Sequence, residues 1–208
     1  AHYPSTADEL SAANMRSKFE ELFFIQLIIM SYARKRQRER IGRRFTRIGD
    51  TFNTFYHNYL PFPLTEAQKR VIREIHADMS SGHQMNRLLQ GDVGSGKTLV
   101  ALMIMLIAID NGCQACIMAP TEILAEQHLQ TFQNFLQDIP IHVELLTGNI
   151  KGKRRSAIEE GLQNGSVNIL IGTHAVIEDN VQFNNLGLVI IDEQHRFGVA
   201  QRARLWQK

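Results

Sequence analysis

The sequence predicts an α/β fold, in which a mostly parallel sheet is flanked by helices and preceded by a long basic helical linker. Apolar runs of strand length alternate with helical patterns between residues 113 and 191. These runs are continuously apolar, which is typical of strands buried on both faces of a parallel sheet. A glycine-rich loop at 91–98 also lies between a short apolar run and a long apolar helix.

Charge divides the chain into two parts. Residues 1–60 carry 10 Lys/Arg against 6 Asp/Glu, and residues 61–208 carry 13 against 15, although the net charge of the whole chain is only +2. A length of 208 residues suits one substantial domain with an appendage. We therefore predict a helical linker segment at 1–60 and an α/β lobe at 61–208.

The longest apolar run near the start fits neither a membrane span nor a signal peptide. The run Leu22–Met30 is too short to cross a bilayer and is interrupted by Gln26. Glu20 and Glu21 precede it, where a signal peptide would be basic. The sequence therefore predicts a cytoplasmic protein with no membrane partner.

Two cysteines, Cys113 and Cys116, have the C-x-x-C spacing of a redox pair. They belong, however, to an apolar run that predicts a buried strand, on which residues three apart point to opposite faces. We therefore predict two buried, reduced cysteines rather than a disulfide.

The segment from Gly91 to Thr98 has the G-x-x-x-x-G-K-[ST] pattern of a phosphate-binding loop. Glycines let backbone N–H groups approach the oxygens of a triphosphate, and the next helix adds its N-terminal dipole. Lys97 is expected to contact the β- and γ-phosphates, and the Thr98 hydroxyl to bind Mg²⁺. The alternative is a glycine turn with a solvated lysine. The predicted ATP-binding residues of the loop are Gly91, Asp92, Val93, Gly94, Ser95, Gly96, Lys97 and Thr98.

Strands and helices are predicted to alternate around this loop. Leu88 and Leu89 predict a short strand before it, and residues 99–109 an apolar helix after it. Further strands are predicted at 116–119, 142–146, 167–171 and 188–191, and further helices at 121–137 and 153–162.

Another helix is predicted to begin at Thr65, after the prolines Pro61 and Pro63 mark a boundary. Thr65 and Gln68 have the spacing of a capping box, in which each side chain accepts a hydrogen bond from the other residue's backbone N–H. The helix is expected to end near Gly82.

Two acids, Asp192 and Glu193, directly follow the apolar run 188–191. In an open parallel sheet, such a strand brings its last residues to the carboxyl edge, where ligands bind. We expect Asp192 to hold Mg²⁺ through water, and Glu193 to orient or deprotonate the water that attacks the γ-phosphate. A solvated acidic turn is the alternative.

The first 60 residues predict a long helix followed by a basic stretch. From about Ala12 to Arg40, apolar residues recur at helical spacing on more than one side, which predicts packing against more than one partner. Residues 31–50 carry eight Lys/Arg and two acids. This stretch either follows a nucleic-acid backbone, with Arg38, Arg43 and Arg44 as contacts, or is a solvated helix end.

Several motifs resemble those of superfamily 2 helicases and translocases. The run Asp192–His195 is similar to their second motif, Ala119–His128 to motif Ia, and Gly172–Ala175 to motif Ib. A closer resemblance, from about Phe19 onward, is to the RecG family of branch-migrating DNA helicases. It is carried by Leu60–Thr65, Leu146–Gly148, Lys151–Lys153 and Ile191–Val199, followed by Gln201 and Arg202.

This resemblance implies a RecA-like lobe of an ATP- and Mg²⁺-dependent motor that acts on forks and Holliday junctions in bacterial recombination and repair. Gln68, with Phe62 nearby, would recognise adenine, a role that competes with the capping box and that we favour. Gln194 and His195 would couple the γ-phosphate to moving parts. The implied contacts to the DNA backbone are Pro120, Thr121, Thr173 and His174. For His174, the alternative to a DNA contact is a local hydrogen bond in a turn.

The resemblance also implies a second lobe with an arginine finger, and a wedge domain, which the sequence lacks. We therefore expect a fragment that binds ATP weakly and hydrolyses it barely, from a full-length ATP hydrolase that works as a monomer. One alternative is a duplex DNA translocase of the Mfd family, against which Gln194 argues because that family usually has Asp-Glu-Glu-His. The other is a nucleotide-gated nucleic-acid-binding module without hydrolysis.

Overall fold

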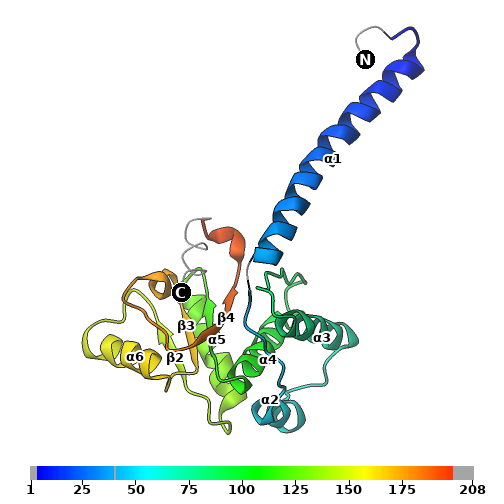
Figure 1. The fold of residues 1–208 in the computed structure, drawn as a ribbon. Coiled ribbons are helices and arrows are strands. Elements are labelled where there is room, and N and C mark those ends of the chain that lie inside the picture. The colour runs from blue at the N-terminus through cyan, green and yellow to red at the C-terminus, as the bar shows by residue number, and fades with distance from the viewer. Residues whose placement is uncertain (1–3, 40, 199–208) are drawn as a thin grey trace.

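The structure, a computed structural model, describes residues 4–39 and 41–198. In Figure 1, the helix α1 (Ala7–Glu39) projects from a body of strands and shorter helices. The body contains, in chain order, α2 (Asp50–Thr54), the π-helical turn η1 (Phe55–Tyr59), α3 (Glu66–Ser80), α4 (Lys97–Asp110), β1 (Gln114–Met118), α5 (Glu122–Leu136), β2 (Val143–Leu146), α6 (Gly152–Asn164), β3 (Ile169–Gly172), the 3₁₀ turn η2 (His174–Ile177), β4 (Leu186–Ile191) and the 3₁₀ turn η3 (Gln194–Arg196).

The four strands form one parallel sheet in the order β2-β3-β1-β4. At its centre, Ile117 is paired with Ile171 of β3 and with Ile190 of β4. All four strands therefore end at the same edge of the sheet. The predicted α/β class and parallel arrangement are confirmed.

The two faces of the sheet are covered by different helices (Figure 1). Ala115 and Ile117 belong to a buried cluster that includes side chains of α3, α4 and α5. Cys116 and Met118 belong to a second cluster with side chains of α6 and η2. Cys113 lies in the first cluster, so the two cysteines are on opposite faces, and both are buried and outside any disulfide, as predicted.

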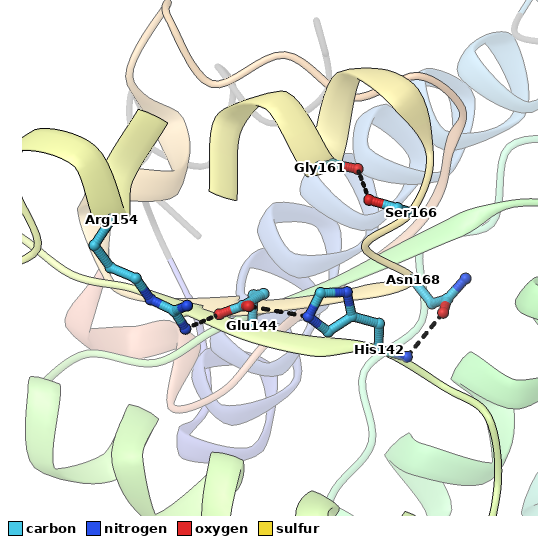
Figure 2. Close-up of polar contacts among 6 residues, drawn as sticks. All are labelled: His142, Glu144, Arg154, Gly161, Ser166 and Asn168. Carbon is cyan, nitrogen blue, oxygen red and sulfur yellow. Dashed lines mark hydrogen bonds and ion pairs between the residues drawn. The ribbon is translucent and has the colours of Figure 1, made fainter. Parts of the chain in front are cut away.

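A buried carboxylate fixes the outer strand, β2. Glu144 is only 8% exposed and accepts hydrogen bonds from Arg154 at 2.5 Å and from the ring of His142 at 3.0 Å (Figure 2). The backbone N–H of His142 donates to Asn168 at 2.9 Å, which ties the strand to the segment before β3. A buried charge with two partners retains the interactions that it would otherwise lose with water.

The predicted strand at Leu88 and Leu89 is not formed, and that prediction is wrong. Both residues line a cavity of about 830 Å³ that Leu188 and Ile190 of β4 also line, and Leu88 is 58% exposed. A strand needs a neighbouring strand for its backbone groups, and this segment has none among the described residues. It is held instead by Arg87, whose guanidinium donates to carboxylates on α3.

Helix α1 differs from its prediction at the N-terminus and in its packing. It begins at Ala7 rather than near Ala12, because the Thr6 hydroxyl accepts the Glu9 backbone N–H at 3.2 Å. Its apolar side chains are exposed, with Phe19 at 63% and Leu22 at 69%, so the predicted packing is not seen among the described residues. No helix in the described ranges is long and apolar enough to cross a membrane.

The part of the basic stretch that follows α1, residues 41–49, is extended, and we call it the strap. The backbone N–H of Gly42 donates to Gly82 at 2.9 Å, and that of Phe45 donates to Met79 at 3.1 Å. The Phe45 side chain is 5% exposed and lies in the same buried cluster as α3 and α4. The helix-end interpretation therefore holds for residues 31–39, which form the C-terminal end of α1, and not for the strap, which packs as part of the body.

One carboxylate, that of Asp110 at the end of α4, holds the start of α2. Its oxygens accept the backbone N–H groups of Gly49 at 3.0 Å, Thr51 at 3.1 Å and Phe52 at 3.0 Å. The first N–H groups of a helix have no partner within the helix, so Asp110 supplies what α2 lacks. This contact joins the strap to the core helix of the body.

We predict that Asp110→Ala lowers the free energy of unfolding by about 1–3 kcal/mol, because it leaves partly buried N–H groups without an acceptor. Urea unfolding followed by circular dichroism measures the change. The matched control is Asp138→Ala, which removes an exposed carboxylate and should have almost no effect. Equal stability of both variants would contradict the role of Asp110.

Candidate nucleotide-binding site

The loop before α4 has backbone conformations that require glycine. Gly94 and Gly96 both have φ of +80°, a left-handed conformation that other residues rarely adopt. A Cβ atom on Gly96 would lie 2.4 Å from the Gln68 side-chain nitrogen, and one on Gly91 would lie 2.7 Å from the Ser95 hydroxyl. The sequence pattern therefore corresponds to a tight loop at the N-terminus of α4.

The Lys97 ammonium is held by the loop itself. Its Nζ donates to the carbonyl of Gly91 at 2.7 Å and to that of Asp92 at 2.8 Å. These carbonyls occupy two of its three donors, and a third remains for another acceptor. Lys97 is thus kept over the loop, where a bound phosphate would meet it.

Gln68 connects α3 to the same loop. The capping box is present: Oε1 of Gln68 accepts the Thr65 N–H at 2.9 Å, and the Thr65 hydroxyl accepts the Gln68 N–H at 3.2 Å. Its Nε2 donates to the Ser95 carbonyl at 3.0 Å. The capping alternative is therefore formed, while the role in adenine recognition, with the 51% exposed Phe62, stays a prediction.

Asp192 lies at the carboxyl end of β4, next to the end of β1. Its backbone N–H donates to Met118 at 2.9 Å. Its Oδ1 accepts the Glu193 N–H at 3.0 Å, and its Oδ2 is 2.9 Å from Nε2 of His128 on α5. The hydrogen bond from His128 is the main cause that holds the pKa of Asp192 below its usual value, against the opposing effect of burial.

Glu193 has an unusual backbone conformation. Its φ of +49° makes it the one residue other than glycine with a positive φ in the described part of the chain. Such strained conformations cluster at functional sites. Its carboxylate is 3.5 Å from the His195 ring, so two predicted site residues are neighbours.

The cavity of about 830 Å³ joins the loop to the two acids. Thr98 and Asp192 both line it, and hydroxyl and carboxylate oxygens are of the kind that Mg²⁺ prefers as ligands. The described residues contain no cluster of three or more His, Cys, Asp or Glu side chains that could hold a metal. The predicted residues that line the cavity are Val93, Gly94, Lys97, Thr98, Asp192, Glu193 and Gln194.

The predicted DNA contacts on the sheet edge differ in exposure. Pro120 and Thr121 follow β1, and Thr121 is exposed, with its hydroxyl accepting the Leu124 N–H at 3.3 Å. His174, after β3, is also exposed. Thr173 is 2% exposed, and its hydroxyl has no partner within the described chain, so this side chain does not reach the surface where DNA would lie.

The three arginines predicted to contact DNA also differ in their surroundings. Arg43 donates to the Asn185 side chain and lies 3.0 Å from the Cys113 sulfur, so it fastens the strap to the body. Arg44 is exposed on the strap. Arg38 is in α1, but its side chain lies outside the described residues.

The sequence analysis included His128 only as the last residue of a motif and did not identify it as a site residue. It lies on the buried stripe of α5 between Ala125 and Phe132, with 11% of its side chain exposed. A histidine on an otherwise apolar stripe was the available signal, but the sequence does not show which group it meets.

The loop, the cavity and the paired acids are the features of a helicase nucleotide site. The model of the DEAD/DEAH box helicase family matches residues 65–208, so the chain belongs to that family. Within that class, it is similar to proteins named ATP-dependent DNA helicase RecG. It is 49% identical to the one from Bacillus subtilis, over the whole chain and 30% of the relative's length. It is 46% identical to the one from Thermotoga maritima, over the whole chain and 26% of the relative's length.

A solved structure of RecG bound to a three-way DNA junction is also similar. It has a TM-score of 0.84 and 44% identity, over 94% of this chain and 27% of the matched chain. The resemblance inferred from the motifs is thereby confirmed. The chain spans 24–30% of the length of the curated relatives that it matches.

We predict that Gly96→Ala weakens ATP binding by about tenfold or more, because a left-handed backbone costs alanine about 1–2 kcal/mol and its Cβ would displace Gln68. Titration with a fluorescent ATP analogue measures the dissociation constant.

The control is Gly112→Ala, which has a similar φ of +73° but nothing within 4 Å of the added Cβ. This variant should lose stability and keep its nucleotide affinity. Equal affinities in the two variants would contradict a specific role for Gly96.

Proposed function

We propose that this chain is the ATP-binding lobe of a DNA helicase motor that hydrolyses ATP and acts on branched DNA. One observation carries the proposal: the loop residues Lys97 and Thr98 and the acids Asp192 and Glu193 line one cavity. A module that only binds nucleotide would not need a strained glutamate beside the phosphate site. All four groups of the predicted hydrolytic site are intact in this chain.

Each group has a chemical task in this proposal. Lys97 binds the β- and γ-phosphates, while Thr98 and Asp192 hold Mg²⁺. When bound, Mg²⁺ offsets the negative charge of the phosphates. Glu193 orients the attacking water and accepts its proton. Gln194 and His195, the residues next to Glu193, carry the state of the γ-phosphate to moving parts.

The remaining predicted contacts belong to the same proposal. Phe62 is exposed and can stack on a base, and the Gln68 amide can exchange its capping bond for one to adenine. Thr121 and His174 are exposed at the carboxyl edge of the sheet, where the DNA backbone would pass.

The proposal also concerns the whole protein. We assign residues 1–60 to a linker, whose residues 41–59 pack onto the lobe, and 61–208 to the first motor lobe, with a second lobe and a wedge domain in the full-length chain. The curated relatives, which are longer, and the solved structure of RecG with a three-way junction support this assignment. The full-length protein would work as a monomer in the bacterial cytoplasm.

The deciding experiment measures ATP turnover by the full-length protein on a synthetic fork and on linear duplex, at one stated salt concentration. We expect stronger stimulation by the fork. Glu193→Gln should abolish turnover while ATP binding remains, because the amide cannot accept a proton. Equal stimulation by the two DNAs would favour a duplex translocase instead.

The matched control for this experiment is Glu160→Gln, which makes the same chemical change at an exposed position of α6. It should leave turnover unchanged. Turnover by Glu193→Gln at the wild-type rate would exclude Glu193 as the general base.

We further predict that Arg44→Gln reduces the salt dependence of DNA binding by about one unit of log–log slope, if its guanidinium neutralises one phosphate. Arg43→Gln should instead lower stability, because Arg43 holds Asn185 and Cys113. Binding isotherms at several salt concentrations measure the slope. An unchanged slope in Arg44→Gln would assign the strap a purely structural role.

A further inference from the structure

His128 joins two parts of the chain that are far apart in sequence. Its Nε2 lies 2.9 Å from Oδ2 of Asp192, 64 residues later. An ionised carboxylate only accepts hydrogen bonds, so the histidine nitrogen is the donor in this contact.

The position of His128 follows from the parallel pairing of β1 and β4. The Asp192 backbone N–H donates to Met118, the last residue of β1. The chain then turns at Thr121, which caps α5, and the second turn of this helix brings His128 over the end of β4. The backbone of Asp192 is thus fixed by β1 and its carboxylate by α5.

The His128 side chain lies in largely apolar surroundings on α5. The side chain is 11% exposed and lies on the helix stripe between Ala125 and Phe132, both of which are fully buried. The His128 and Phe132 rings have centroids 6.4 Å apart. Its neighbours on this stripe of the helix are apolar, and the imidazole forms its hydrogen bond with Asp192.

The two oxygens of Asp192 are each held by one donor. Oδ1 accepts the Glu193 N–H at 3.0 Å and Oδ2 accepts from His128. A carboxylate has about four lone-pair sites, so these two bonds leave others free toward the cavity. The carboxylate plane is therefore fixed before any ligand arrives.

We propose that His128 is a positioning residue, which acts through Asp192 and orients the carboxylate toward Mg²⁺ and its water in the nucleotide site. This inference rests on the proposed function, because it concerns the same site. Hydrogen bonds from neighbouring groups to a metal-binding carboxylate typically change metal affinity by about 10–100-fold.

The test uses the full-length protein and a fluorescent ATP analogue, whose binding is titrated with Mg²⁺. His128→Leu should raise the Mg²⁺ concentration for half-maximal binding by about 10–100-fold, and leave binding in excess EDTA unchanged. In steady-state assays it should lower kcat more than it raises KM for ATP.

The rescue variant is His128→Gln, whose amide nitrogen can donate at nearly the position of Nε2. It should restore most of the Mg²⁺ dependence of the wild type. The packing control is Phe132→Leu, which removes fully buried volume from the same stripe. It should lower the melting temperature and leave the Mg²⁺ midpoint unchanged.

Three results would overturn the inference. They are a wild-type Mg²⁺ midpoint in His128→Leu, equal impairment by the Gln and Leu variants, and wild-type nucleotide binding that is independent of Mg²⁺. Failure of the proposed function is a separate result, namely a wild-type protein whose ATP turnover no DNA stimulates. In that case the Mg²⁺ titration of nucleotide binding still tests the positioning role of His128.

Discussion

The parallel pairing of β1 with β3 and β4 is the constraint on which the candidate site depends. Parallel strands end at the same edge of a sheet, and β1 lies between β3 and β4. Asp192, at the end of β4, is therefore next to Met118, from which the chain continues into α5. Without that pairing, neither the loop after β1 nor the acids after β4 would have a fixed position.

The phosphate-binding loop depends on a different set of contacts. Leu88 and Leu89, which precede it, pair with no strand among the described residues, so the sheet does not hold the loop from that side. Helix α3 holds it instead. Gln68 donates to Ser95 within the loop, and Arg87 at the start of the segment donates to Glu74 and Asp78. The shape of the loop is thus coupled to the helix whose N-terminus carries the capping box.

The strap links the basic linker to the same body. Phe45 and Phe52 are buried in the cluster that contains α4, and Asp110 at the end of α4 caps the start of α2. A movement of α4, the helix that begins at Lys97, would therefore be transmitted to the strap by these packing contacts and hydrogen bonds. Arg43 adds a second attachment, to Asn185 just before β4.

The sequence by itself determined the features that depend on local chemistry. The glycines of the loop, the Thr65 capping box and the continuously apolar strands each follow from conformational preference or periodicity within a few residues. The end of one such strand predicted the position of Asp192 and Glu193. Cys113 and Cys116 were placed on opposite faces by the same alternation.

The tertiary structure decided what depends on a partner distant in sequence. Leu88 and Leu89 have strand composition, yet a strand forms only where another strand supplies hydrogen bonds. Thr173 follows a strand end, as Thr121 does, but packing buries it and leaves Thr121 exposed. Periodicity places His128 on the buried stripe of α5, but only the crossing of that helix over β4 identifies its partner as Asp192. Each of these outcomes depends on a neighbour that lies beyond the reach of a local sequence pattern.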